Sequence, residues 1–319
     1  IRDRFYAPAK GGMETALRHQ AEGLLEAGHD LRVVVAGHDS ATSREDLPGA
    51  PGALVRAGVA WTWNSQPVSP DLSGSLRREI RDFRPEIVHL HTPNPLACWA
   101  WLRARGEARR LGVKLAVWHH SDIVRQRLSG RLVQPLVRRC LAEAAGICVS
   151  SESLRGSSRE LAPWRDRVRV IPFGIDPAPF AAVTAGEGPF LFVGRLVRYK
   201  GLEVLLEAVA RLPEASLDIV GTGPLAENLA RTIRRRRLGD RVRLRGEIAD
   251  GDLPTVLAAS RALVLPSRDR SETFGLILLE AMAAGLPLVA SDLPTGVREL
   301  ARPGETAWVA PPGDPVALR

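Results

Sequence analysis

Residues 190–211 read F-L-F-V-G-R-L-V-R-Y-K-G-L-E-V-L-L-E-A-V-A-R. The four apolar residues 190–193 predict a strand buried on both faces, and residues 202–211 have the apolar content of a packed helix. A strand, a short glycine-containing loop and a helix make up the repeating unit of an α/β domain with a parallel sheet. The stretch therefore predicts an α/β protein.

Apolar runs of the same strand type recur on both sides of this stretch, separated by helical segments. After residue 193 they cover residues 216–220, 242–244, 262–265 and 288–290. Before residue 190 they cover residues 31–36, 87–90, 114–118, 145–150 and 168–171. The pattern predicts two Rossmann-like, doubly wound domains with parallel sheets, facing a cleft lined by the carboxyl ends of the strands.

The domain boundaries follow from a break in this alternation. Residues 176–189 are rich in proline, alanine and glycine and carry no periodic apolar signal, so we expect a linker between domains at 1–175 and 190–319. The chain starts without Met, and a helix at residues 14–27 precedes its first strand. We therefore expect that a first strand is missing at the front and that further helices are missing after Arg319.

Composition narrows the class of protein. The 319 residues are 45% hydrophobic and 25% charged, as in soluble globular proteins. No apolar run reaches the roughly 18 residues that span a bilayer, and residues 1–10 are too polar for a signal peptide, which predicts a cytoplasmic protein. Cys98, Cys140 and Cys148 lack metal-type spacing, which favours reduced, packed thiols.

The net charge of +8 has two explanations, and both stay open. It favours an anionic partner such as phosphorylated substrates, nucleic acid or a membrane surface. Only three of the 44 basic residues are lysines, however, and a GC-rich genome produces such an arginine excess without selection for binding.

The loop after residue 193 carries candidate binding residues. Arg195 and Lys200 flank the start of the helix at 202–211, where free N–H groups and the helix dipole favour a diphosphate. A solvated basic surface is the alternative.

Residues 267–280, S-R-D-R-S-E-T-F-G-L-I-L-L-E, place Glu272 in a loop and Glu280 eight residues later, within an apolar run. A carboxylate in such surroundings needs hydrogen-bond donors, which vicinal sugar hydroxyls would supply. The alternatives are an ion pair for Glu280 and a helix N-terminal charge for Glu272.

At residues 272–292 the sequence E-T-F-G-L-I-L-L-E-A-M-A-A-G-L-P-L-V-A-S-D resembles the E-x7-E signature of retaining family 4 glycosyltransferases, which have the GT-B fold. Further motifs of the family follow in the expected order along nearly the whole chain. They lie at residues 11–14, 89–95, 119–122, 170–176, 193–200 and 221–224.

The resemblance implies a donor site on the second domain. Arg195 and Lys200 would grip the diphosphate without a metal, Glu280 would bind the ribose hydroxyls, and Glu272 would bind hydroxyls of the transferred sugar. Three backbone N–H groups would meet phosphate or sugar oxygens; they belong to Phe274, Gly275 and Leu276. In the first domain, Gly12 would allow close approach to the phosphates.

The resemblance also implies roles on the acceptor side. His120 would lie beside the transferred sugar, while His119 stands where the family more often has an aromatic residue. Asp122 is a candidate for contacting the acceptor. His89 and His91 would be structural or acceptor-side residues.

The implied reaction moves a hexose with retention, the departing diphosphate oxygen helping to deprotonate the acceptor. The stretch 118–126 resembles members acting on surface polysaccharides, so GDP-mannose is the first expected donor and a UDP-hexose the second. The acceptor would be a glycan or lipid-linked, at the inner face of the plasma membrane. We expect no cofactor, metal or nucleic acid. The alternative is a non-catalytic GT-B fragment that binds nucleotide or membrane.

Three other signals have plainer interpretations. Residues 250–252 read D-G-D, for which helix capping is preferred over a metal site. The stretch from Gly221 to Gly223 is not followed by the third glycine of a dinucleotide fingerprint, which argues against a dehydrogenase. The arginines of 231–245 are accompanied by no aromatic platform for nucleic acid, so a solvated helix face is preferred.

The basic amphipathic segment 125–139 leaves two alternatives open, core packing and attachment to anionic lipid.

Overall fold

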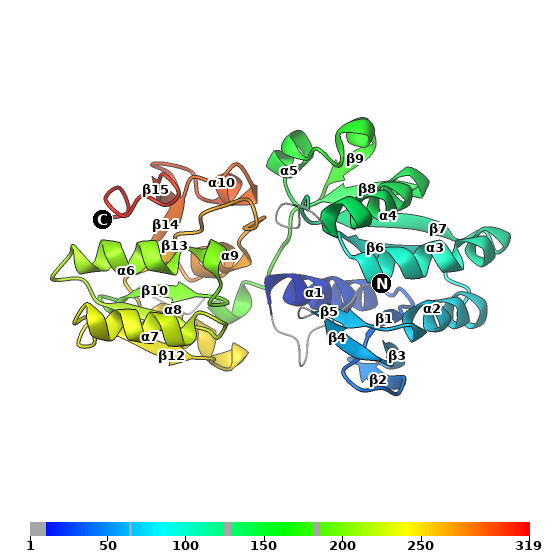
Figure 1. The fold of residues 1–319 in the computed structure, drawn as a ribbon, viewed down its shortest axis with the longest axis horizontal. Coiled ribbons are helices and arrows are strands. Elements are labelled where there is room, and N and C mark those ends of the chain that lie inside the picture. The colour runs from blue at the N-terminus through cyan, green and yellow to red at the C-terminus, as the bar shows by residue number, and fades with distance from the viewer. Residues whose placement is uncertain (1–10, 64–65, 124–128, 181–185) are drawn as a thin grey trace. The chain divides into compact units, whose positions relative to one another are not determined.

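The computed structural model describes residues 11–63, 66–123, 129–180 and 186–319. The chain forms two compact units, Ile1–Pro172 (unit 1) and Phe173–Arg319 (unit 2) (Figure 1). Phe173 belongs to the second unit because its ring packs edge-on against Phe274, with 5.2 Å between the ring centroids.

Unit 2 contains one six-stranded sheet in the order β12-β11-β10-β13-β14-β15, and every pair in it is parallel. Its strands are β10 (Phe190–Val193), β11 (Leu217–Val220), β12 (Val242–Gly246), β13 (Ala262–Leu265), β14 (Leu288–Ser291) and β15 (Ala307–Ala310). Numbered from β10, this is the 3-2-1-4-5-6 order of a Rossmann sheet. The strand order reverses between β10 and β13, which is where such sheets bind ligands.

Helices cover both faces of this sheet. They are α6 (Leu202–Ala210), α7 (Ala226–Arg235), α8 (Leu253–Ala258), α9 (Leu276–Ala283) and α10 (Gly296–Leu300). Adjacent residues of β10 enter different hydrophobic clusters, because alternate strand residues point to opposite faces. Leu191 packs with residues of α8, α9 and α10, and Phe192 with residues of α6 and α7. The doubly wound prediction is confirmed for this unit.

Part of the expected linker belongs to unit 2. A 3-10 turn, Ala178–Phe180, begins where the Asp176 side chain accepts a hydrogen bond from the N–H of Ala178. Phe180 is buried in the cluster that contains Leu191. Residues 181–185 of the expected linker lie outside the described residues.

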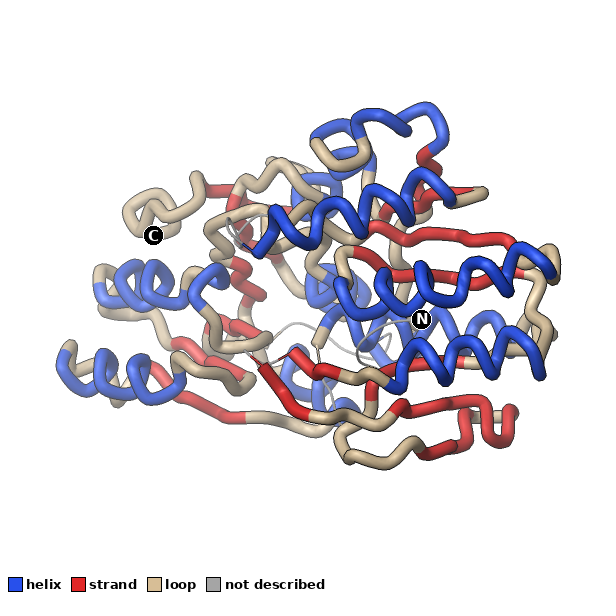
Figure 2. Tube along the Cα trace, turned by 45° about the vertical axis from the view of Figure 1, so that its right-hand side comes forward, coloured by secondary structure: helices blue, strands red, loops and turns tan. Residues whose placement is uncertain are grey.

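Unit 1 contains a parallel sheet in the order β6-β7-β8-β9 and two smaller sheets. The parallel strands are β6 (Ile87–Thr92), β7 (Lys114–His119), β8 (Gly146–Val149) and β9 (Val168–Val170), close to their predicted positions. The helices are α1 (Gly12–Glu26), α2 (Asp71–Asp82), α3 (Pro95–Arg110), α4 (Ser129–Glu143) and α5 (Glu152–Ser157). Figures 1 and 2 show α2 and α3 running side by side.

Only one strand of the two smaller sheets, expected at residues 31–36, was predicted from the sequence. β1 (Val33–Ala36) pairs in parallel with β3 (Ala50–Ala57), which pairs antiparallel with β2 (Ser43–Leu47). A hairpin of β4 (Trp61–Trp63) and β5 (Gln66–Val68) follows. Most of β2 is exposed, so it lacks the apolar run by which strands were predicted.

The structure also bears on the basic amphipathic segment, the cysteines and the question of a membrane span. Val133, Leu136 and Val137 of α4 pack against the core of unit 1, so the described part of this amphipathic helix uses its apolar face for packing. The rest of the segment, residues 124–128, lies outside the described residues. All three cysteines are free thiols. Among the described residues, no helix is both long and apolar enough to cross a bilayer.

The predicted capping role of residues 250–252 is wrong. Asp252 precedes α8 in an α-helical conformation and makes no side-chain hydrogen bond to the helix, because Asp250–Asp252 is itself a 3-10 turn. A capping side chain requires an extended backbone at that position.

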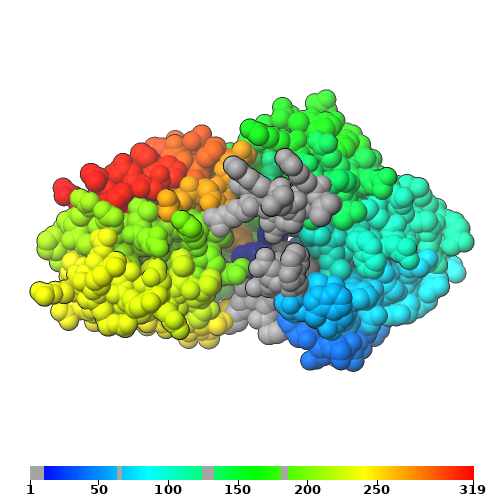
Figure 3. Space-filling model, in the orientation of Figure 1, coloured from blue at the N-terminus to red at the C-terminus, as the bar shows by residue number. Residues whose placement is uncertain are grey.

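The arginine-rich segment 231–245 lies at the surface of unit 2, in yellow in Figure 3. Three of its arginines have partners in unit 2, and one of these is Arg236, which lies 3.9 Å from Glu207. Arg241 donates to the backbone carbonyls of Leu212 and Ala215, and Arg245 pairs with Asp218 at 2.8 Å.

Candidate active site

The loops after β10 and β13 touch at the switch point of unit 2. Gly201, the N-cap residue of α6, has φ +72°, and a Cβ there would lie 2.0 Å from the carbonyl oxygen of Pro266. The N–H of Arg268 also donates to the carbonyl of Tyr199 at 2.7 Å. The sheet order and this contact bring together the two loops that the sequence singled out for donor binding.

A buried ion pair lies between these loops. The Nζ of Lys200 is 2.6 Å from Oε2 of Glu272, and the hydroxyl of Ser267 donates to the same oxygen at 2.8 Å. Both charged residues are under 10% exposed. Burial alone would lower the pKa of Lys200, but the Glu272 carboxylate outweighs it and the pKa lies above its ordinary value. The sequence singled out both residues but not their pairing, nor Ser267.

Arg195 differs from Lys200 in its surroundings. Arg195 is exposed, and no ion pair to its side chain occurs among the described residues. The helix that follows, α6, has Gly201 as its N-cap residue and no side-chain cap, so its first N–H groups are available to a ligand. Lys200 is therefore a fixed, buried cation, whereas Arg195 is an exposed one.

The start of α9 presents backbone donors. Gly275 is the N-cap residue with φ +81° and makes no side-chain cap, while the preceding Phe274 is buried. The first N–H groups of a helix have no intrahelical acceptors, so those of α9, beginning at Leu276, can meet an anion or a hydroxyl.

Glu280 lies in α9, two turns after the loop. No hydrogen bond or ion pair to its side chain occurs within the part of the chain that the structure describes. Burial, with a smaller contribution from Asp250, raises the pKa of Glu280 to about 7. The ion pair considered for Glu280 is therefore not formed, and its carboxylate remains available to hydroxyl donors.

Gly12, His120 and Asp122 belong to unit 1. Gly12 is the first residue of α1 and is exposed, at a helix N-terminus without a side-chain cap. His120 follows β7 and is 4% exposed, with its Nε2 2.9 Å from Nδ1 of His91. The two imidazole rings also stack, and the ring of Trp118 lies parallel to that of His120 at 6.3 Å.

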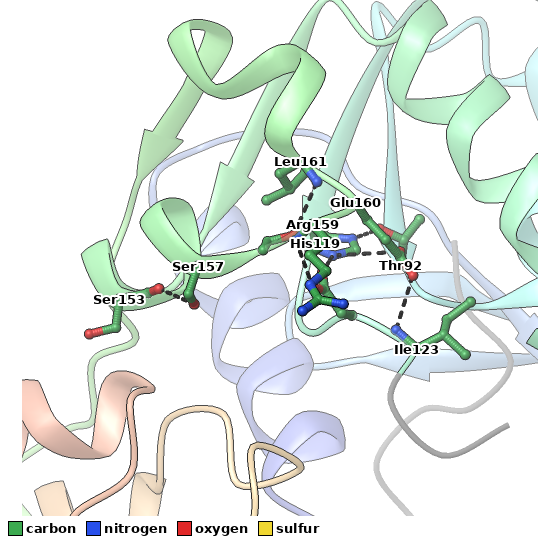
Figure 4. Close-up of polar contacts among 10 residues, drawn as sticks. Thr92, His119, Ile123, Ser153, Ser157, Arg159, Glu160 and Leu161 are labelled. Carbon is green, nitrogen blue, oxygen red and sulfur yellow. Dashed lines mark hydrogen bonds and ion pairs between the residues drawn. The ribbon is translucent and has the colours of Figure 1, made fainter. Parts of the chain in front are cut away.

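His119 is fully buried in a polar network that joins three segments (Figure 4). Its Nδ1 is 3.0 Å from the hydroxyl of Thr92, and its Nε2 is 3.4 Å from Oδ1 of Asp122 and 3.9 Å from Oε2 of Glu160. The other Glu160 oxygen accepts from the N–H of Ile123 at 3.0 Å. Glu160 was not singled out from the sequence, because nothing in its spacing marks it.

Asp122 is held by protein donors. The hydroxyl of Ser158 donates to Oδ1, and the N–H of Arg159 donates to Oδ2 at 2.9 Å. Burial alone would raise the pKa of Asp122, but these hydrogen bonds and the one to His119 lower it to about 2. Both carboxylate oxygens are thus used inside unit 1, and a contact to the acceptor stays a prediction.

Comparison with known proteins places these features in a class. Residues 10–179 match the family model for Glycosyltransferase Family 4, and residues 182–319 match that for Glycosyl transferases group 1. The structure resembles a sucrose-phosphate synthase from Thermosynechococcus elongatus with a TM-score of 0.78, covering 97% of this chain and 82% of that one at 24% identity. The class is that of glycosyltransferases with the GT-B fold.

Two relatives narrow the class to a family. The chain is 36% identical to an O-antigen chain mannosyltransferase C of Escherichia coli, over 98% of this chain and 84% of that protein. It is 34% identical to a D-rhamnosyltransferase of Pseudomonas aeruginosa, over 80% of this chain and 68% of that protein. The chain belongs to the group 1, family 4 glycosyltransferases.

Proposed function

We propose that this chain transfers a hexose, mannose in the first instance, from a nucleotide diphosphate sugar to a glycan or lipid-linked acceptor, with retention of anomeric configuration. The observation that carries the proposal is the buried pair of Lys200 and Glu272 at the switch point of unit 2. The similarity to an O-antigen chain mannosyltransferase supports mannose as the sugar and a surface polysaccharide as acceptor. GDP-mannose is our first candidate donor. A UDP-hexose is the second candidate donor.

Lys200 suits a leaving diphosphate. An ammonium group has three N–H donors, and the pairing with Glu272 needs only one of them. Because burial and the ion pair fix the position of Nζ, the charge is already in place when negative charge builds on the departing diphosphate. Arg195, being exposed, would close over the diphosphate after binding.

Glu272 suits a positioning role toward the sugar. Lys200 and Ser267 both contact Oε2, and Oε1 has no hydrogen-bond partner among the described residues. Oε1 is thus an acceptor for a sugar hydroxyl. Glu280 would accept hydrogen bonds from the ribose hydroxyls. The free N–H groups at the N-terminus of α9 would donate hydrogen bonds to phosphate or sugar oxygens. His120 would lie beside the sugar, and the departing diphosphate oxygen would take the acceptor proton.

The first test is calorimetric titration with GDP, UDP and ADP at low and high salt. We expect micromolar binding of one nucleotide by the wild type, and at least a tenfold loss in Arg195→Ala/Lys200→Ala. Arg198→Ala is the matched control, because Arg198 is an exposed cation of the same loop. Equal, salt-sensitive binding of all three nucleotides by every variant would reduce the loop to a generic basic surface.

Loss of Lys200 alone leaves Glu272 buried without its cation, which costs about 3–5 kcal/mol of stability. Lys200→Met/Glu272→Gln removes both charges and keeps the volume, so it should fold. We expect this double variant to lose turnover at least 100-fold, while the wild type converts the donor to a product whose anomeric configuration, read by NMR, is retained.

The rival proposal is a nucleotide- or membrane-binding chain without turnover. It would be favoured if the wild type binds nucleotide but transfers no sugar from GDP-mannose or UDP-hexoses to lipid-linked acceptors. An inverted product would overturn the retaining mechanism alone. We further propose that the enzyme works in the cytoplasm, at the inner face of the plasma membrane where lipid-linked acceptors lie.

A further inference from the structure

Unit 1 brings three potential metal ligands together from distant parts of the chain. His119 ends β7, Asp122 follows three residues later, and Glu160 lies in the segment after α5. Their atoms Nε2, Oδ1 and Oε2 lie within 4.8 Å of one another. Ligands bound at about 2.1 Å in a tetrahedral site lie roughly 3.4 Å apart. The distances from Nε2 to the two carboxylate oxygens are 3.4 and 3.9 Å, so a small contraction would bring the three atoms to that spacing.

Separate contacts hold each of the three side chains in place. Thr92 holds the Nδ1 of His119, which directs Nε2 toward the carboxylates. The N–H of Arg159 holds Oδ2 of Asp122, and that of Ile123 holds Oε1 of Glu160. Metal sites in proteins have this arrangement, in which outer hydrogen bonds orient the ligands and fix the histidine tautomer.

Glu160 carries the second, independent observation. It is 4% exposed, and its Oε2, the atom that faces His119 and Asp122, has no hydrogen-bond partner among the described residues. A buried carboxylate oxygen without a donor is costly, and Asp122 brings a second carboxylate close to it. A bound cation would satisfy Oε2 and screen the two carboxylates from each other.

We propose that His119, Asp122 and Glu160 form a binding site for a divalent metal ion of the zinc class. One imidazole and two carboxylates are a ligand set that Zn²⁺ accepts, with a fourth position left for water. The ion would tie the segment after β7, which includes His120, to the segment after α5. All three proposed ligands belong to unit 1, whereas the donor residues Lys200 and Glu272 belong to unit 2.

The test uses the full chain, dialysed against EDTA and then titrated with ZnCl₂ by calorimetry. We expect one Zn²⁺ per chain at micromolar affinity or tighter, with no comparable binding of Mg²⁺. Glu160→Gln and Asp122→Asn should each weaken binding at least tenfold. Glu152→Gln is the matched control, because Glu152 is an exposed carboxylate of the same unit that pairs with Arg155.

Two further readouts keep the result independent of folding defects. Zn²⁺ should raise the melting temperature of the wild type and of Glu152→Gln but not of Glu160→Gln. Co²⁺ bound to the wild type should show visible bands of nitrogen and oxygen ligation without a thiolate charge-transfer band. The absence of stoichiometric binding, equal Zn²⁺ affinity in Glu160→Gln and Glu152→Gln, or a thiolate band would overturn the proposal. If Zn²⁺ does not bind stoichiometrically, the residues around His119 form a metal-free hydrogen-bond network.

Discussion

At the scale of single residues, two glutamates eight positions apart have different surroundings. Glu272 contacts Lys200 and Ser267, whereas Glu280 has no side-chain partner within the described part of the chain. Burial raises the pKa of Glu280 to about 7, so its charge changes near physiological pH. If Glu280 binds the two ribose hydroxyls, donor affinity should depend on this titration.

We predict that nucleotide affinity rises as pH increases through about 7, because only the ionised carboxylate accepts hydrogen bonds from both hydroxyls. For a group with a pKa near 7, binding at pH 6 should be about tenfold weaker than at pH 8. Calorimetry across this range measures it. Glu280→Gln, which cannot ionise, gives the baseline that includes titration of the nucleotide phosphate itself.

The same shift has a consequence for stability. The folded-state pKa lies above the ordinary value, so the stabilisation from the protonated form is complete at low pH and lost as pH rises through about 7. Glu280→Gln should therefore unfold at higher denaturant than the wild type at pH 8, and the difference should shrink toward pH 5. A pH-independent difference in both affinity and stability would contradict the assignment.

At the scale of elements, the site depends on how closely the loops after β10 and β13 approach each other. Gly201 has φ +72°, and a Cβ there would lie 2.0 Å from the carbonyl oxygen of Pro266. We predict that Gly201→Ala costs about 2 kcal/mol or more of stability, through strain and the clash. Because the loop must shift, nucleotide affinity should fall as well.

The matched control is Gly239→Ala, since Gly239 follows α7 and a Cβ there meets nothing within 4 Å. Urea unfolding and nucleotide titration of both variants check the prediction. If Gly201→Ala matches Gly239→Ala in both measurements, the close approach of the loops is not required for the site.

The elements differ in how well they could be predicted from the sequence. The strands of the two parallel sheets were predictable, except β15, because burial on both faces requires continuous apolar runs. β2, β3 and the hairpin strands β4 and β5 were missed. β2 is mostly exposed and β4 and β5 are short, so they have no such run, and the run of β3 is interrupted by Pro51, Gly52 and Arg56. In the candidate donor site the motif singled out Lys200 and Glu272, but their pairing depends on two loops 72 positions apart. Glu160 had no local signal at all, since its role depends on a contact with β7.

At the scale of the whole molecule, each unit has its own hydrophobic interior. Two of the clusters lie within residues 173–319, one on each face of the six-stranded sheet, and Leu191 and Phe192 are fully buried in them. A domain of about 150 residues buries roughly 70% of the surface of its unfolded chain, which is enough for independent folding. All the proposed donor residues except Gly12 lie in this unit, and His120 and Asp122 do not.

We predict that residues 173–319, produced alone, fold cooperatively and bind the preferred nucleotide within about threefold of the full chain. They should transfer no sugar, because the residues proposed to lie beside the sugar and the acceptor belong to residues 1–172. Thermal unfolding, calorimetry and a transfer assay measure the three properties on the same sample, with Lys200→Met/Glu272→Gln in the isolated unit as the control for specific binding. A folded unit that fails to bind nucleotide would show that unit 1 supplies essential donor contacts, Gly12 being the first to test. Sugar transfer by the isolated unit would instead remove His120 from the proposed mechanism.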